Sequence, residues 1–182
     1  MDAASLYETE RLYLRPTGSE DAEFIFALMN SPKWIQYIGD RNIRDVVEAE
    51  AYILNKMSPQ YERLGFGNYT LIRKADMVKI GTCGLYDREG LDGVDIGFAF
   101  LPQFEKQGYG FEAASKVKSL GFEVFNLEKI SAITTKENLN SQKLLLKIGL
   151  KYSGMHTPPD DEPLMLFSEM NPKTENQSLK TI

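Results

Sequence analysis

The chain has 182 residues, 42% of them hydrophobic and 26% charged, which is typical of a single globular domain. Its 26 acidic and 21 basic residues give a net charge of −5, which disfavours a dedicated nucleic-acid-binding protein. A single cysteine excludes an internal disulfide and a cysteine-rich zinc site. No metal is implied by the sequence. No apolar run is long enough to span a membrane or to serve as a signal sequence, and we expect a cytoplasmic protein.

The N-terminal part of the chain predicts one strand followed by two helices. Residues 11–16 alternate apolar with polar side chains and stop at a proline, which is typical of a short strand with one buried face. Apolar residues at helical spacing follow over about residues 20–29 and again over residues 45–57. We expect the proline-containing segment 30–32 to end the first of these helices.

The middle of the chain changes to the period of two that is typical of strands. Residues 68–73, 77–85 and 92–100 predict three strands joined by short polar turns. Parallel neighbours need a crossover of a dozen or more residues, so these strands should form an antiparallel meander. The remaining predicted elements are, in chain order, a helix over residues 109–125, a strand over 129–134, a helix over 141–148, an optional short strand over 151–155 and a strand over 164–170.

The order of these elements predicts an α/β (α+β) fold. It fits a mixed, mostly antiparallel sheet with helices on both faces. No linker or repeat divides the chain, so we assign residues 1–170 to one domain. Residues 171–182 are polar, and we expect them to form a disordered C-terminal tail.

The segment of residues 107–113, QGYGFEA, carries the clearest chemical signal. It opens a predicted helix shortly after a predicted strand. Two glycines allow the backbone to approach a ligand closely, and the free N–H groups at a helix N-terminus favour an anion such as a pyrophosphate. The plainer reading is a helical first turn that contains two glycines and binds nothing.

The same glycines also match the dinucleotide-binding pattern G-x-G-x-x-A at residues 108–113. In that fold the glycines follow their strand within one or two residues, whereas residues 101–107 separate them here. Several βαβ units must also follow, and only one strand–helix unit remains. The context therefore argues against a nucleotide-dependent oxidoreductase.

Four segments carry a resemblance to a known family: TERLYLRP at residues 9–16, DIGF at 95–98 followed by Pro102, GYGFEA at 108–113, and NLNS at 138–141 followed by KIGL at 147–150. They are similar to TERLxLRP, EIGY…P, GYATEA and NxxS…KxGF of the GNAT superfamily of acetyl-coenzyme A-dependent N-acyltransferases. The resemblance covers about residues 8–170 and is closest to the branch of ribosomal-protein N-terminal (alanine) acetyltransferases. It implies a GNAT-like fold and transfer of an acetyl group from acetyl-coenzyme A to a primary amine, on a protein N-terminus or a small molecule.

The resemblance also implies how the co-substrate is held. Acetyl-coenzyme A would dock across the end of the predicted 92–100 strand, with its pyrophosphate on the glycine segment. Strand N–H groups near Phe98 and Ala99 would stabilise the developing oxyanion. The residues implied to contact the coenzyme are Phe98, Ala99, Phe100, Gln107, Gly108, Tyr109, Gly110, Phe111 and Asn138.

Asp95 and Ser141 are the candidate catalytic residues. The strand period puts Asp95 on one face with Gly97 and Ala99, which suggests a gap where a substrate could enter. The matching residue of the family is usually a glutamate, so Asp95 would take a proton from the amine through water or would only orient the substrate. Ser141 opens a predicted helix, so it is either the N-cap or, by the resemblance, a group near the coenzyme sulfur.

Two positions depart from the family pattern. Glu105 stands where a glutamine or arginine often begins the pyrophosphate loop, and we expect this acid to turn away from the ligand. Leu145 stands where many members have a tyrosine that protonates the leaving thiolate, a role that leucine cannot take. We expect Lys33, Arg41 and Arg44 to form a solvated face.

The resemblance leaves several points open. Trp34, Tyr37 and Tyr61 come from the region that lines the acceptor site in the family, but packing in the core explains them equally well. The partner would be an amine acceptor, and the protein would be a monomer or a homodimer. The alternative function is a non-catalytic, coenzyme A-binding regulatory or scaffold protein.

Overall fold

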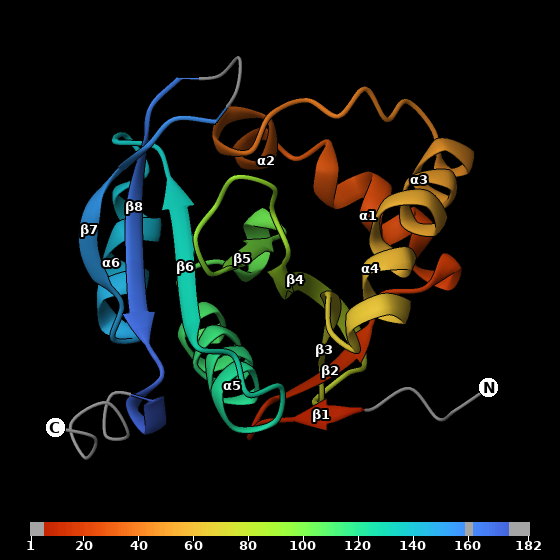
Figure 1. The fold of residues 1–182 in the computed structure, drawn as a ribbon. Coiled ribbons are helices and arrows are strands. Elements are labelled where there is room, and N and C mark those ends of the chain that lie inside the picture. Colours follow the sequence, from red (N-terminus) through yellow and green to blue (C-terminus); the bar gives the residue numbers. More distant parts are fainter. Residues whose placement is uncertain (1–5, 159–161, 175–182) are drawn as a thin grey trace, which may run out of the picture.

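The computed structural model describes residues 6–158 and 162–174. The described residues form an eight-stranded sheet in the order β1-β2-β3-β4-β5-β6-β8-β7 (Figure 1). Neighbouring strands are antiparallel except for β5 and β6, which are parallel. The strands are β1 (Tyr7–Glu8), β2 (Leu12–Pro16), β3 (Asn68–Arg73), β4 (Val78–Tyr86), β5 (Val94–Phe100), β6 (Lys129–Thr134), β7 (Lys151–His156) and β8 (Leu164–Met170).

Helices lie on both faces of the sheet. The long helix α5 packs against the central strands β4 and β5, the shorter α6 packs against β6 and β7, and α1 to α4 gather on the other side (Figure 1). The helical elements are η1 (Ser19–Asp21), α1 (Ala22–Met29), α2 (Pro32–Tyr37), α3 (Val46–Tyr52), the π-helical η2 (Ile53–Met57), α4 (Ser58–Leu64), η3 (Pro102–Phe104), α5 (Tyr109–Glu123) and α6 (Leu139–Lys147). The predicted fold class is therefore confirmed.

Alternate residues of β5 reach two separate apolar cores, as the period of two requires. Ile96 and Phe98 belong to the larger core, which α5 and α6 cover. Ala99 packs against the smaller core of α1, α3 and η2. Each face of this strand is thus covered by a different group of helices.

Most predicted elements are confirmed, and the antiparallel meander of β3, β4 and β5 is among them. Helix α2 was not predicted. It begins at Pro32, where we expected only the end of the preceding helix. Proline is compatible with the first turn of a helix, since its missing N–H has no partner there. The second predicted helix also continues beyond residue 57 as α4, to Leu64.

The feature of the fold that creates a site is the divergence of β5 from β6. Only two residue pairs join them, Val94 with Ile130 and Asp95 with Ser131. From Ile96 to Phe100, β5 pairs only with β4. Its second edge is open over these residues, which leaves backbone groups available on that side.

The C-terminal end of the described chain packs on the domain. Asn171, the first residue of the expected tail, is 4% exposed and donates hydrogen bonds to the carbonyl oxygens of Phe122 and Leu127. The part of the tail at residues 175–182 lies outside the described residues. Among the described helices, none is long and apolar enough to cross a membrane.

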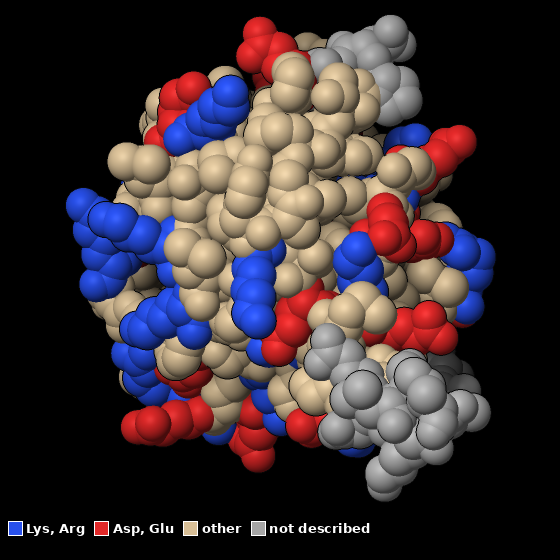
Figure 2. Space-filling view, turned by 60° about the vertical axis from the view of Figure 1, so that its left-hand side comes forward, with Lys and Arg blue, Asp and Glu red and all other residues tan. Residues whose placement is uncertain are grey.

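The side of the molecule formed by β7, β8 and α6 is brought forward in Figure 2. It has a broad uncharged area, and the charged side chains lie mainly around its margins (Figure 2). Strand β7 is the edge of the sheet, and its Tyr152 and Met155 are exposed.

Candidate active site

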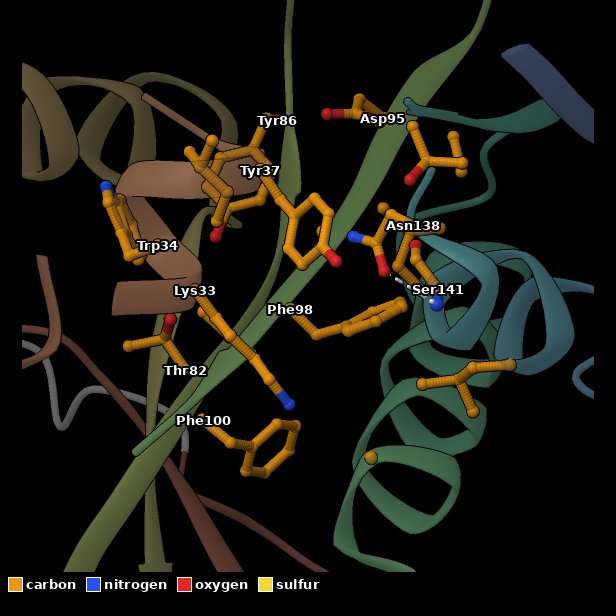
Figure 3. Close-up of a pocket in the computed structure, with 18 of the residues that line it drawn as sticks. Lys33, Trp34, Tyr37, Thr82, Tyr86, Asp95, Phe98, Phe100, Asn138 and Ser141 are labelled. Atoms are coloured by element: carbon orange, nitrogen blue, oxygen red, sulfur yellow. Dashed lines mark hydrogen bonds between the residues drawn. The ribbon is translucent and has the colours of Figure 1, made fainter. Parts of the chain in front are cut away.

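A cavity of about 580 Å³ opens where β5 and β6 diverge. Side chains from α2, β4, β5, α5 and α6 line it, so segments that are far apart between residues 29 and 147 meet there. In Figure 3, Lys33, Trp34 and Tyr37 of α2 lie on one side of β5, and Asn138 and Ser141 of the α6 region lie on the other. Nearly all the residues that the sequence singles out are brought together around this cavity.

The N-terminus of α5 forms one end of the cavity. Gly108 is its N-cap and has φ 86°, a left-handed conformation that glycine adopts without strain. The first intrahelical hydrogen bond runs from Glu112 N–H to the Gly108 carbonyl. The N–H groups of Tyr109, Gly110 and Phe111 precede that bond, and they can therefore bind an anion.

The side chains of Gln107 and Tyr109 do not line the cavity. The Gln107 amide donates to the carbonyl oxygen of Gln103, 2.9 Å away. Tyr109 is buried, and the guanidinium carbon of Arg11 lies 4.4 Å from its ring centre. Both residues could serve a ligand only through their backbone groups.

We expected the Glu105 side chain to turn away from the ligand site, but it does not. It lines the cavity and forms an ion pair with Lys33, which also lines it. Lys33 is 45% exposed, as expected of a solvated side chain, but it also reaches across from α2 toward β5 (Figure 3). The lysine neutralises the acid that would otherwise repel a pyrophosphate.

The lining is strongly basic, in contrast to the net charge of −5 for the whole chain. Among the described residues the cavity has two acids, Asp95 and Glu105. The basic residues of the lining are Lys33, Arg41, Lys56, Arg88, Lys106, Lys143 and Lys147. Such a concentration of cations fits a ligand that carries several phosphate charges.

The β5 residues of the predicted coenzyme site also line the cavity. Phe98, Ala99 and Phe100 lie on the segment that β6 leaves unpaired. The Phe98 and Phe100 rings come from the α5 face of the strand, and both appear at the cavity in Figure 3. They provide an apolar wall beside a free strand edge.

Helix α6 is capped by Asn138, and the reading of Ser141 as the N-cap is wrong. The Asn138 side chain accepts a hydrogen bond from the Ser141 N–H at 3.1 Å. The helix begins at Leu139, two residues earlier than we predicted. The Ser141 hydroxyl is therefore not used for capping, and Ser141 lines the cavity.

Asp95 lies at the point where β5 and β6 part, and it is 2% exposed. Burial raises the pKa of its carboxyl group, although the neighbouring Arg88 guanidinium and the Ile133 N–H lower it. Arg88 Nε donates to Asp95 Oδ2 at 2.5 Å. The candidate base is thus a buried carboxylate with one cationic partner, and the sequence did not point to that partner.

Tyr86 occupies part of the space beside Gly97, and Asp95, Gly97 and Ala99 all line the cavity, as expected for this face of β5. A Cβ atom on Gly97 would lie 2.9 Å from Tyr86 Cε2, and one on Gly84 would lie 2.9 Å from the Tyr86 hydroxyl. Gly84 and Gly97 are paired across β4 and β5, so the ring lies over two glycines. The absence of side chains at this glycine pair leaves room for the aromatic ring. The sequence alone does not show this, because the two glycines become neighbours only through the strand register.

Two other expectations concern side chains near the cavity. Leu145 lines it but is 1% exposed and belongs to the core, so it acts as an apolar wall. Trp34 and Tyr37 line the cavity, whereas the Tyr61 ring packs edge-on against Tyr69. Of the three aromatic residues considered for the acceptor site, Trp34 and Tyr37 could therefore contact an acceptor, and Tyr61 could not.

The comparisons with known proteins agree with this geometry. A family model described as the acetyltransferase (GNAT) domain matches residues 11–151. YoaA, an uncharacterized N-acetyltransferase of Bacillus subtilis, is 30% identical over 151 residues, covering 82% of this chain and 85% of YoaA.

Solved structures share the fold. A RimL ribosomal L7/L12 alpha-N-protein acetyltransferase in complex with coenzyme A superposes with a TM-score of 0.77 at 13% identity, over 91% of this chain and 98% of that one. The ribosomal-protein-S5-alanine acetyltransferase of Vibrio fischeri gives 0.75 at 18% identity, over 92% and 97%. The chain therefore belongs to the GNAT acetyltransferase family and is an acetyl-coenzyme A-dependent N-acetyltransferase.

Proposed function

We propose that the protein transfers the acetyl group of acetyl-coenzyme A to a primary amine by direct attack of the amine on the thioester. The observation that carries this proposal is the cavity at the β5–β6 divergence. It has an anion-binding helix end on one side and a buried carboxylate, Asp95, on the other. Holding both reactants in one cavity supplies much of the rate enhancement, because it converts a bimolecular reaction into an effectively unimolecular one.

The residues fit the proposed co-substrate. The free N–H groups at Gly110 and Phe111 would bind the pyrophosphate. Lys106 and Lys147 would bind further phosphate charge, and Asn138, at the start of α6, would contact the coenzyme at another point. At the open edge of β5, the Phe98 N–H would donate to the thioester oxygen as it becomes negative, whereas the Ala99 N–H points toward β4.

Asp95 is proposed as the group that receives the amine proton, through one water molecule. An alkyl or peptide amine is mostly protonated at neutral pH, and only the free amine can attack. A carboxylate whose pKa is raised by burial accepts a proton more readily than one in water. Arg88 holds this carboxylate from one side, which fixes its orientation.

Ser141 is proposed to assist the leaving thiolate, directly or through a water molecule. It lines the cavity from α6, one helical turn before Leu145. Leu145 has no proton to give, so the hydroxyl of Ser141 is the acid that α6 offers at this end of the cavity.

The acceptor class that we propose is a peptide or protein N-terminal amine. Two structural neighbours are described as acetyltransferases of ribosomal proteins, one acting on an α-amino group and one on an alanine. The opening of the cavity past Trp34 and Tyr37 would admit an extended chain end. A small-molecule amine is the second acceptor class to be tested.

The deciding experiment measures thiol release from acetyl-coenzyme A with two sets of acceptors. One set contains hexapeptides with N-terminal alanine, serine or methionine, and the other contains polyamines and amino sugars. We expect turnover with peptides and none with the same peptides blocked by N-formylation. Binding of acetyl-coenzyme A without turnover of any amine would instead support the alternative of a non-catalytic, coenzyme A-binding protein.

A further inference from the structure

A chain of hydrogen bonds runs from the cavity into the interior of the protein. Tyr86, at the cavity wall, is joined to Asn68 on β3, with 2.5 Å between the hydroxyl and Oδ1. Asn68 Nδ2 lies 2.7 Å from Thr17 Oγ1, and Thr17 Oγ1 lies 2.8 Å from Thr70 Oγ1. Thr70 Oγ1 lies 3.0 Å from Oδ2 of Asp21, which ends the chain.

The chain ends on a carboxylate that is held in its charged form. Asp21 is fully buried. Burial tends to raise its pKa, but Lys79, the Gly18 N–H and Arg15 together lower it below the ordinary value. Its Oδ1 lies 2.7 Å from Lys79 Nζ and 2.8 Å from an Arg15 nitrogen. An ionised carboxylate has no proton, so it can only accept.

That charge fixes the direction of every bond in the chain. Thr70 must donate its only hydroxyl proton to Asp21, so it accepts from Thr17. Thr17 has then used its own proton, so it can only accept from Asn68, which turns its amide nitrogen toward Thr17. Asn68 therefore presents its oxygen to Tyr86, and the Tyr86 hydroxyl must donate to it.

The Tyr86 oxygen consequently has no proton to offer to the cavity. It retains a lone pair, and it stays neutral because burial raises the pKa of the phenol. Tyr86 is also directly opposite Asp95 in the β4–β5 register. Tyr86 and Asp95 both line the cavity, and both offer acceptors, a neutral oxygen and a carboxylate.

From this arrangement we propose that Tyr86 is a specificity-determining binding residue for the acceptor amine, because its oxygen accepts one amine N–H while Asp95 serves as the proton acceptor. Asn68, Thr17, Thr70 and Asp21 are positioning residues that hold the Tyr86 hydroxyl in this orientation. A group without an N–H or O–H would leave the Tyr86 lone pair unsatisfied. The inference rests on the proposed function, since it concerns the acceptor of that reaction.

The first test replaces Tyr86 by phenylalanine and uses the N-terminal-alanine hexapeptide as the probe. We expect KM for the peptide to rise about tenfold, the size typical of one lost hydrogen bond to a charged or strongly polar group. kcat should stay within about threefold, and the Kd for acetyl-coenzyme A within about twofold. A merely structural role for Tyr86 would change all three together. An unchanged peptide KM overturns the proposal.

Tyr69 provides the matched control. It is the next residue to Asn68, is fully buried, and has a hydroxyl with no hydrogen-bond partner among the described residues. Tyr69→Phe therefore also removes a buried tyrosine hydroxyl, but one outside the chain that ends at Asp21. We expect it to leave the peptide KM unchanged, and an equal rise in both variants would overturn the proposal.

A second variant tests the orientation itself, away from the cavity. Thr70→Val keeps the size of the side chain and the ion pairs of Asp21 but interrupts the chain of donors. The Tyr86 hydroxyl is then free to point its proton into the cavity. We expect the peptide KM to rise about three- to tenfold, with acetyl-coenzyme A binding unchanged. A Thr70→Val variant that melts earlier but keeps the wild-type peptide KM contradicts the positioning role.

A measurement on the ligand-free protein separates this inference from the proposed function. In the NMR spectrum we expect a slowly exchanging hydroxyl proton that disappears in Tyr86→Phe and changes in Thr70→Val. Failure of every amine to be acetylated, with this proton present, rejects the proposed reaction and leaves the orientation of Tyr86 supported. Absence of the protected proton from the wild-type spectrum overturns the inference, whatever the activity.

Discussion

Arg11 and Glu112 join the first long strand of the sheet to the helix whose N-terminus would bind the coenzyme. Arg11 Nε donates to Glu112 Oε2 at 2.7 Å, and the Arg11 N–H donates to Oε1 at 2.8 Å. The same arginine donates to the carbonyl oxygen of Gln107, in the loop before α5. Arg11 and Glu112 thus connect two of the segments that resemble the family, residues 9–16 and residues 108–113.

The first prediction concerns this contact. Glu112→Gln keeps the shape of the side chain but removes its charge, and we expect a loss of about 1–2 kcal/mol in the free energy of unfolding. Burial raises the pKa of Glu112, but Thr9 and Arg11 outweigh it and lower the pKa. The stabilisation is therefore present above the ordinary pKa of a glutamate and is lost as the pH falls below about 4.

Thermal unfolding between pH 3 and pH 7 checks this prediction. We expect the difference in Tm between the wild type and Glu112→Gln to be largest at neutral pH and to shrink in acid. Since Arg11 also holds Gln107, the Kd for acetyl-coenzyme A should rise a few-fold in the same variant. A difference in Tm that is constant over this range would contradict the assigned role of the ion pair.

The second prediction concerns Asp95 as the base. Asp95→Asn is nearly equal in size, and we expect it to lower kcat by at least about tenfold, as is typical of a lost general base. Acetyl-coenzyme A should still bind, since Asp95 lies at the other end of the cavity from α5. The deficit should shrink at higher pH, where solvent has already deprotonated the amine. A variant that keeps its kcat and loses only affinity for the acceptor would show that Asp95 positions the substrate.

The third prediction uses Arg88, which lowers the pKa of Asp95. Arg88→Met removes this positive charge, so the pKa of Asp95 should rise further. The acidic limb of the kcat/KM profile should therefore move to higher pH. Arg63→Met is the matched control, since Arg63 pairs with Asp87 on the surface. An acidic limb that stays in place in Arg88→Met would exclude Asp95 as the group that titrates.

The fourth prediction concerns the ion pair between Lys33 and Glu105. Glu105→Gln removes an acid from the end of the cavity that is proposed to bind phosphate, and it frees the Lys33 ammonium. We expect the KM for acetyl-coenzyme A to fall about two- to fivefold at low salt, and less at high salt, because salt screens the attraction. Lys33→Ala should have the opposite effect. Asp92→Asn changes the net charge equally but lies at an exposed site, so it should change nothing.

The fifth prediction separates the roles of Ser141 and Asn138. Because Asn138 caps α6, Asn138→Ala should destabilise the protein by about 1 kcal/mol. Ser141→Ala should leave Tm within about a degree of the wild type but lower kcat more than it weakens coenzyme binding. Equal kcat in Ser141→Ala and wild type would remove Ser141 from the leaving-group step.

The sequence by itself determined the fold class and the order of most helices and strands along the chain, and it singled out the glycine segment proposed to bind the coenzyme. These properties are local, because alternation of apolar residues, turn residues and helix-terminal glycines act over a few neighbouring positions. The bounds of β6 and β8 were predicted without error for this reason. The helix α2 was missed because a proline begins it and its six residues are too few to show a period.

Only the tertiary structure decided the chemistry around Asp95 and Glu105. Arg88, Tyr86 and Lys33 reach these positions through the strand register and through the packing of α2 across the cavity. Lys33 and Glu105 are separated by 72 residues in the chain. Burial, ion pairing and the direction of a hydrogen bond are properties of side chains brought together from distant segments, so no spacing in the sequence encodes them.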